Sequence, residues 1–342
     1  VPEFSYLQGD LTKAYSSKIK NFKRSFVFMN FKNSVHPAAL MVYDKIYSSN
    51  KDFKKYWLLH SVDPPYIEND TATIARDGYI GNTKGTYNGK LVNHTLIPDL
   101  SDLNIEKIGG ADNRFPVFDG KGGYKNYPNA PYYDNTSLEP GSWRVQISPK
   151  TSREFDRFLN VMEIMDYKDQ NGVSTKPLKV QKVDGDLVEG AKIYDRVVLF
   201  NKADLNITGN INFSIEAAAG DKVPYKFLIT GLSEGQWAVK ITGDSDSMQI
   251  GPLLVSGNTV SGKNNNVLEF EGPAGKYCIY KISSGDVSND GKVNSTDLSI
   301  LKSVILQTVT SEYNKVNADL NSDGKINSFD YLLLKKKILS GS

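Results

Sequence analysis

The stretches DVSNDGKVNSTDLSILKSVIL (residues 286–306) and DLNSDGKINSFDYLLLKKKIL (residues 319–339) are two copies of one unit, offset by 33 residues. Eleven of the 21 aligned positions are identical, and they are Asp, Gly, Asn, Ser, Lys, Leu and Ile positions rather than a generic apolar pattern. Each copy begins as a polar loop and continues into an amphipathic segment, at residues 298–305 and 332–338. The repeat therefore predicts two successive loop-helix units at the C-terminus.

Each loop has the spacing of an EF-hand-like calcium loop, with oxygen ligands at positions 1, 3, 5, 7, 9 and 12 and a turn glycine at position 6. The incoming helix of a true EF-hand is missing. In the first copy the predicted ligands are Asp286, Ser288, Asp290, the backbone carbonyl of Lys292, Asn294 and Asp297. In the second copy they are Asp319, Asn321, Asp323, the backbone carbonyl of Lys325, Asn327 and Asp330.

Two departures from the usual pattern qualify these loops. Position 12 is Asp where a sensor EF-hand has Glu, and Ser288 stands where Asp or Asn is usual, so we expect the first site to be the weaker one. Three carboxylates in each loop would repel one another without a cation. We therefore expect two Ca²⁺ ions whose binding is coupled to folding.

Residues 285–342, which hold both loops, resemble a type I dockerin of the clostridial kind, the module that attaches an enzyme to a cohesin of a cellulosome scaffoldin. The resemblance implies a secreted, extracellular cellulosome component with a cohesin partner. It also implies a cohesin-facing surface made of positions 10 and 11 of each loop and basic or small residues of each helix: Ser295, Thr296, Lys302, Ser303, Ser328, Phe329, Lys335 and Lys336. Phe329 and Ser303 differ from their counterparts in the other copy. For any single lysine, a solvated helix face is the alternative.

The composition excludes several other classes of protein. The 342 residues predict two or three domains, and 41 Lys and Arg against 39 Asp and Glu leave no basic field for nucleic acid or an anionic membrane. No apolar run is long enough to span a membrane. Cys278 is the sole cysteine, so an intrachain disulfide is excluded. Because the chain opens at Val1 without a signal segment, we expect a piece of a longer polypeptide.

The region before the repeats reads as β-structure, with short aromatic and β-branched runs between Gly, Asn, Asp and Pro clusters. No long helical period intervenes, so we predict a mainly β chain: an antiparallel β-sandwich over 1–170, a smaller β-domain over 171–283 and the helical dockerin over 285–342. The polar stretch 168–175 is the predicted boundary between the two β-domains.

Several strand and turn motifs of the first β-domain occur in a recognisable order: FSYLQGD at 4–10, WLLHS at 57–61, NYP at 126–128 and GSWRV at 141–145. They resemble the C-terminal β-sandwich part of heparinase II/III-like polysaccharide lyases. The resemblance implies β-elimination of a uronic-acid polysaccharide, with the catalytic Tyr and a carboxylate-neutralising Asn or His on an N-terminal helical toroid. No such segments stand in these 342 residues. We therefore expect no catalytic residue here, an inactive chain on its own and a catalytic half of the same protein as a partner.

The first β-domain also contains candidate sugar contacts. Aromatic faces stack on sugar rings, which makes the Tyr-rich loop at 122–133 a candidate, and His60 stands near the end of a strand. Packing against the sandwich explains the same residues equally well. The candidate substrate contacts are His60, Tyr124, Tyr127, Tyr132 and Tyr133.

Two alternatives stay open. The chain can be a non-catalytic, carbohydrate-binding cellulosomal protein, or a structural calcium-binding adhesion protein that binds no cohesin.

Overall fold

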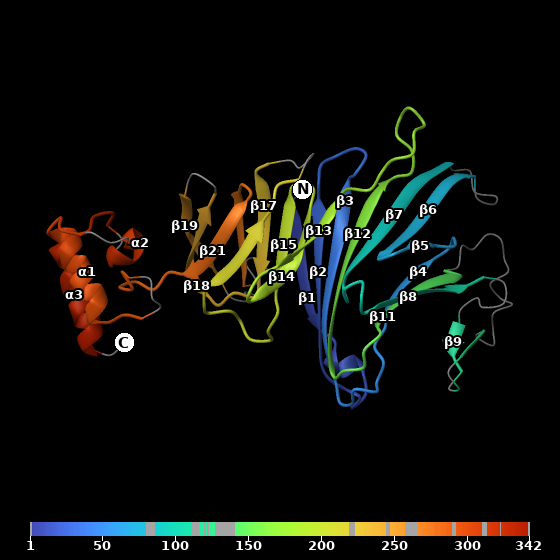
Figure 1. Cartoon of the computed structure of the whole chain (residues 1–342), viewed down its shortest axis with the longest axis horizontal. Helices are drawn as coiled ribbons and strands as arrows, with labels where there is room; N and C mark the ends of the chain where they lie inside the picture. Colours follow the sequence, from blue (N-terminus) through green and yellow to red (C-terminus); the bar gives the residue numbers. More distant parts are fainter. Residues whose placement is uncertain are drawn as a thin grey trace. The chain divides into compact units, whose positions relative to one another are not determined.

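The computed structural model describes residues 2–79, 86–110, 116–119, 121, 123–126, 141–218, 223–243, 247–256, 266–288, 292–309, 313–321 and 323–340. Strands make up about half of it and helices a small, C-terminal part (52% and 11%), which confirms the predicted mainly β fold (Figure 1). The chain divides into two compact units, Val1–Lys182 with Ala191–Arg196, and Val183–Gly190 with Val197–Ser342.

The first unit is built around a seven-stranded sheet in the order β1-β2-β3-β12-β7-β6-β5 (Figure 1). Strand β12 comes last in the sequence of these strands, yet it pairs antiparallel with both β3 and β7 in the middle of the sheet. The strands are β1 (Phe4–Asp10), β2 (Ile19–Asn30), β3 (Ala38–Ser48), β5 (Tyr66–Glu68), β6 (Thr71–Tyr79), β7 (Thr86–Ile97) and β12 (Phe155–Asp166). A 3-10 turn, η1 (Thr12–Ala14), lies between β1 and β2.

A three-stranded sheet, β4-β11-β8, completes the first sandwich. Its strands are β4 (Trp57–Ser61), β8 (Leu103–Gly109) and β11 (Trp143–Pro149), and a separate pair is formed by β9 (Pro116–Phe118) and β10 (Tyr124–Asn126). Alternate residues of β11, Val145 and Ile147, are fully buried and pack with Phe158 and Met162 of the larger sheet. Residues two apart point to the same face of a strand, so both side chains reach this core. Gln146 and Ser148 on the other face of β11 are buried as well.

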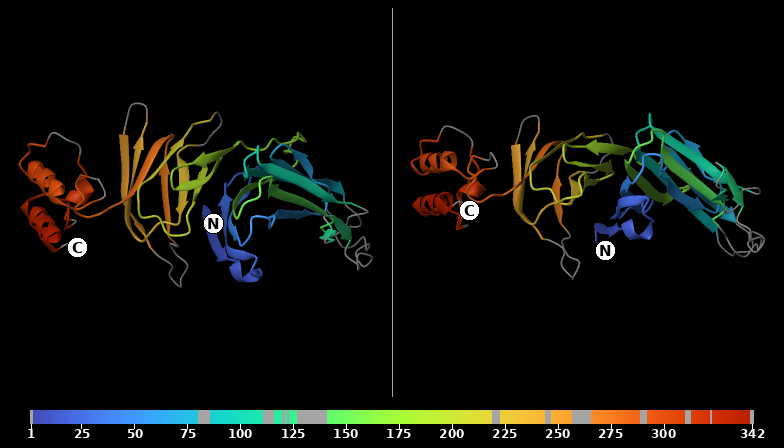
Figure 2. Two further views of the ribbon diagram at one scale, coloured as in Figure 1. Left: turned by 60° about the horizontal axis from the view of Figure 1, so that its bottom comes forward. Right: turned by 90° about the horizontal axis from the view of Figure 1, so that it is seen from below.

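The second β-domain is a sandwich of a five-stranded and a four-stranded sheet, in the orders β13-β14-β15-β17-β20 and β16-β21-β18-β19 (Figure 2). Its strands are β13 (Val180–Asp184), β14 (Val188–Ile193), β15 (Arg196–Asn201), β16 (Ile211–Ile215), β17 (Tyr225–Thr230), β18 (Gly235–Thr242), β19 (Ser247–Val255), β20 (Val267–Gly272) and β21 (Gly275–Lys281).

Aromatic rings fill the space between these two sheets. Phe213 stacks on Tyr277 with ring centroids 4.9 Å apart, and Phe227 stacks on Phe270 at 4.5 Å. Trp237 is fully buried, and its indole N–H donates to the backbone oxygen of Ser233 at 2.9 Å. Trp237 therefore belongs to the core and offers no exposed ring to a sugar.

The described residues of the C-terminal region form three helices, α1 (Ser295–Ile305), α2 (Lys315–Ala318) and α3 (Ser328–Ser340). α1 and α3 lie side by side (Figures 1 and 2). The fully buried Leu301 and Leu334, which are aligned in the repeat, pack with Val287 and Ala318 between the helices. Helix α2 was not predicted, because four residues are too few to show a helical period.

Candidate functional site

The last ligand position of each predicted calcium loop lies at the start of a helix. Asp297 is fully buried in the first turn of α1. Its carboxylate accepts the backbone N–H of Ser288 at 2.7 Å and that of Asn294 at 2.9 Å. The side chain of Asn294 in turn accepts the N–H of Thr296 at 2.7 Å and caps the helix. The helix start thus fixes one end of the loop to the other.

The second loop repeats this arrangement. Asp330 is fully buried in the first turn of α3, and its two oxygens accept the N–H groups of Leu320 and Asn327, both at 2.9 Å. Asn327 accepts the N–H of Phe329 at 2.7 Å. The hydrogen bonds that involve Asn327 match those of Asn294 in the first loop, whereas Leu320 lies one position before the residue that aligns with Ser288. The two buried carboxylates occupy equivalent places in the repeat.

The first position of the first loop is also buried. The backbone oxygen of Asp286 accepts the side-chain amide of Asn317 at 2.6 Å, and the hydroxyl of Ser288 lies 3.4 Å from an Asp286 carboxylate oxygen. Lys292 is exposed. Asp290, the predicted ligand at position 5, lies outside the described residues.

The middle of the second loop is held by its own N–H groups. Asp319 accepts from the backbone of Asp323 at 3.1 Å and of Gly324 at 2.8 Å. Asp323 accepts the amide of Asn321 and the N–H of Lys325, each at 2.8 Å, and these two hydrogen bonds lower the pKa of its carboxyl. Gly324 has φ +80°, a conformation that glycine adopts without strain, as position 6 requires.

The donor set of both loops suits a hard cation. All side-chain atoms at the predicted ligand positions are carboxylate, amide or hydroxyl oxygens, the ligands that Ca²⁺ prefers. Among the ion pairs of the described residues none includes Asp297 or Asp330, so these buried carboxylates have no cationic side chain to balance them. Each carboxylate oxygen that accepts one N–H keeps a lone pair for a metal.

The carboxylates of the second loop, all of which are described, are not gathered into one cage. No three acidic, histidine or cysteine side chains lie together as metal ligands anywhere in the described part of the chain. In the second loop the three carboxylates instead bond to separate N–H groups along the loop, as described above. The residues fit calcium by chemistry and order, and a bound ion would have to draw them together.

The residues with implied roles in partner binding lie on the surface of the helices. Ser303 is half-buried, and the other seven are exposed: Ser295, Thr296, Lys302, Ser328, Phe329, Lys335 and Lys336. Leu332, exposed on 60% of its surface, lies one turn after Phe329 and was not among the predicted residues. Its three-residue spacing from Phe329 could have revealed it, because such residues share a helix face.

The candidate sugar contacts are placed only in part. His60 is exposed on β4 and stands opposite Arg144 of β11. Partial burial, with a smaller contribution from Arg144, lowers the pKa of the His60 imidazole. Tyr124 begins β10, but its side chain is not described, and Tyr127, Tyr132 and Tyr133 lie outside the described residues. Of these five residues, only His60 therefore has a described side chain.

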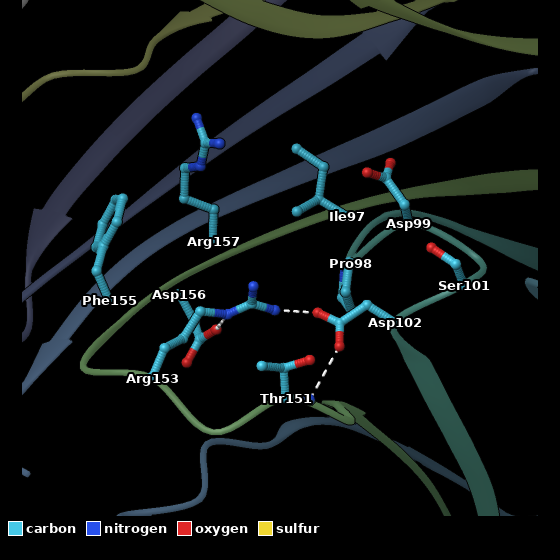
Figure 3. Close-up of a pocket in the computed structure, with 10 residues that line it drawn as sticks. All are labelled: Ile97, Pro98, Asp99, Ser101, Asp102, Thr151, Arg153, Phe155, Asp156 and Arg157. Atoms are coloured by element: carbon cyan, nitrogen blue, oxygen red, sulfur yellow. Dashed lines mark hydrogen bonds and ion pairs between the residues drawn. The ribbon is translucent and has the colours of Figure 1, made fainter. Parts of the chain in front are cut away.

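A pocket of about 480 Å³ opens in the first unit between the segment after β7 and the β11–β12 turn (Figure 3). Arg153 reaches two carboxylates on its wall, donating Nε to Asp156 at 2.6 Å and pairing with Asp102. Lys55 is buried and donates to Asp156 at 2.7 Å. This chain of charges joins residues about a hundred positions apart, so no local sequence pattern could have revealed it.

The comparisons with known families agree with this architecture. Residues 284–339 match the dockerin type I domain, and residues 182–281 match the heparinase II C-terminal domain. The second match covers the second β-domain, whereas the sequence motifs placed the lyase resemblance on residues 1–170. A search of curated proteins finds no match to the chain.

The chain therefore carries a heparinase II C-terminal domain that is followed in the sequence by a type I dockerin domain. It is a cellulosomal module attached to a polysaccharide-lyase-like part, and such components are extracellular. The type I dockerin family binds calcium, and the two domains imply a cohesin and a polysaccharide as partners. None of the described helices is long and apolar enough to cross a membrane.

Proposed function

We propose that this chain anchors a polysaccharide lyase to a scaffoldin, through calcium-dependent binding of a type I cohesin by its dockerin. The observation that carries the proposal is the repeated placement of a buried carboxylate, Asp297 and Asp330, at the end of each loop. A buried charge without a cationic side chain is costly. A bound Ca²⁺ supplies the balancing charge and holds each loop against its helix.

Two ions are proposed, one in each loop. In the first loop the ligands are Asp286, Ser288, Asp290, the carbonyl of Lys292, Asn294 and Asp297. In the second loop they are Asp319, Asn321, Asp323, the carbonyl of Lys325, Asn327 and Asp330. Since α1 and α3 begin at these loops and pack on each other through Leu301 and Leu334, ordering of the loops also orders the exposed helix faces.

Calorimetric titration of the whole chain with a type I cohesin tests the anchoring role. We expect tight binding in calcium and none in excess chelator, and titration of the chelated chain with CaCl₂ should give two ions per chain. Failure to bind a panel of type I cohesins in calcium would contradict the proposal and favour a structural calcium-binding protein. Binding that persists in chelator would contradict calcium dependence alone.

For the lyase-like part we propose an acidic, uronate-containing polysaccharide, with the catalytic groups on another segment of the same protein. The alternative is a non-catalytic carbohydrate-binding role, which the polar pocket around Arg153 favours, because fixed charged donors and acceptors suit sugar hydroxyls. Affinity electrophoresis in gels that contain polygalacturonate, heparin or neutral glucan measures whether the chain binds a polysaccharide and whether that polysaccharide is acidic. Retardation that Arg153→Met abolishes would support sugar binding by the pocket, and formation of an unsaturated uronate by this chain alone would refute its inactivity.

A further inference from the structure

The two helices that begin at the calcium loops present chemically different faces. The α1 face consists of Thr296, Ser299, Lys302 and Ser303, and the aligned α3 face consists of Phe329, Leu332, Lys335 and Lys336. Residues three, four and seven apart lie on one side of a helix, so each set forms one surface. Only the lysine at the third place is common to both faces.

The α3 face is apolar and projects from the domain. Phe329 is 53% exposed and Leu332 is 60% exposed, while Asp330 and Leu334, on the other side of the helix, are fully buried. The core between α1 and α3 therefore does not use these two side chains. An exposed Phe and Leu one turn apart form an apolar surface that a partner can bury.

The α1 face has little to offer in comparison. The hydroxyl of Ser299 donates to the backbone oxygen of Ser295 at 2.9 Å, and that of Ser303 donates to Ser299 at 3.0 Å. These protons are thus already bonded within the helix, and Thr296 adds only one small side chain. Leu306 and Leu339, both exposed, are aligned and do not distinguish the two faces.

The α1 and α3 faces also differ in charge. Lys335 and Lys336 are both exposed beside the apolar pair on α3, whereas α1 has Lys302 followed by a serine. An aromatic anchor in an apolar pocket with charges at the rim is the usual composition of the energetic centre of an interface. The fitting partner surface is an apolar pocket bordered by carboxylates.

We infer that this dockerin uses its two faces unequally: the α3 face binds the cohesin, by insertion of Phe329 and Leu332 into an apolar pocket flanked by acidic residues, and the α1 face contributes little. The inference rests on the proposed cohesin binding. It names Leu332 as a contact and assigns one orientation of the dockerin on its partner, although the two loops are closely alike.

Cohesin titration of the whole calcium-loaded chain tests it with matched variants. Phe329→Thr with Leu332→Ser gives α3 the residues of α1 and should weaken binding about 30-fold or more, the size expected for loss of a central anchor. The control Thr296→Ala with Ser299→Ala should change affinity less than threefold. The variant Lys336→Ser should bind cohesin with a few-fold lower affinity, and the loss of affinity should be larger at low salt than at high salt.

Folding is monitored separately, by calcium-dependent helical circular dichroism of each variant. Since the substituted residues are exposed, we expect no change in this signal. Loss of affinity by the α1 variant alone, or near-neutral effects of each variant with loss only when both faces are changed, would overturn the inference while cohesin binding stands. If the unsubstituted chain binds no cohesin, the proposed function fails and the inference with it.

Discussion

The second β-domain and the dockerin differ in what fills their interiors. Twenty buried apolar residues of the described chain form the core of the β-domain, against four in the dockerin. The dockerin instead buries the carboxylates of Asp297 and Asp330. Small domains with a limited core commonly depend on a metal or a disulfide. The comparison teaches that one region is stabilised by apolar burial, whereas the other carries buried carboxylates whose cost, on our proposal, a bound ion offsets.

Removal of calcium should produce the largest difference in stability between the two regions. In excess chelator we expect the dockerin helices α1 and α3 to unfold, because the carboxylates of each loop then repel one another. Both β-sandwiches should keep their strand signal. Far-ultraviolet circular dichroism, together with the near-ultraviolet signal of the aromatic residues buried in the sandwiches, recorded on one sample, checks this. A dockerin that keeps its helices in chelator would show that its four-residue core suffices.

Truncation of one large core side chain in each region sharpens the comparison. Trp237→Ala should destabilise the β-domain by about 3–5 kcal/mol, and Leu334→Ala should cost the dockerin about 2–5 kcal/mol. The loss in the small dockerin is the larger share of its total stability, so calcium should no longer fold it fully. Thermal unfolding in calcium measures both. The control Leu254→Ala, exposed on 67% of its surface, should stay within about 0.5 kcal/mol.

Neutralisation of a loop carboxylate tests whether burial matters beyond charge. In Asp330→Asn the new amide would meet the N–H of Leu320 or Asn327 instead of accepting it, at a cost of about 1–3 kcal/mol besides weaker calcium binding. Asp323→Asn removes the same charge from an exposed position and should mainly weaken calcium binding. Calcium titration with thermal melts of both variants separates the effects. Equal melting temperatures at saturating calcium would contradict the distinction.

The smallest expected effect concerns acid and the β-domain. Burial raises the pKa of Asp186, but the hydrogen bonds that Asn212 and the N–H of Leu187 donate to its carboxylate outweigh burial and lower it. Because the folded pKa lies below the unfolded one, this stabilisation is complete above the unfolded pKa and is lost as pH falls through the folded pKa. For so solvated a group we expect less than about 1 kcal/mol. The melting temperature of Asp186→Asn should therefore vary less with pH than that of the unsubstituted chain.

Local patterns were sufficient for the class of fold. Strands such as β16, whose residues alternate between buried and exposed, follow from a period of two, and the repeat predicted that α1 and α3 follow the two polar loops. In both loops the structure also places a buried carboxylate, Asp297 or Asp330, that accepts the N–H of the aligned Asn294 or Asn327. The predicted calcium ligands and cohesin-facing residues remain predictions, since neither ion nor partner has tested them.

The family match extends the lyase resemblance beyond the residues on which the sequence motifs placed it. Motifs of strands and turns pointed to residues 1–170, while the family match falls on 182–281. Strand motifs are weak markers, because any sandwich needs similar alternation and turn residues. The loop spacing of the dockerin is specific by contrast, because a metal fixes the identity and the order of its ligands.

The sequence by itself determined what is local: the loop-helix repeat, the alternation of the strands and the absence of a disulfide. Only the tertiary structure placed β12 between β3 and β7, joined Lys55 to Asp156 at the pocket, and separated the buried Leu334 from the exposed Phe329 and Leu332. The physical reason is that local pattern depends on neighbours within a turn or a strand. Pairing across a hundred residues, and the side of a helix that stays in water, depend on which other surfaces are buried against it.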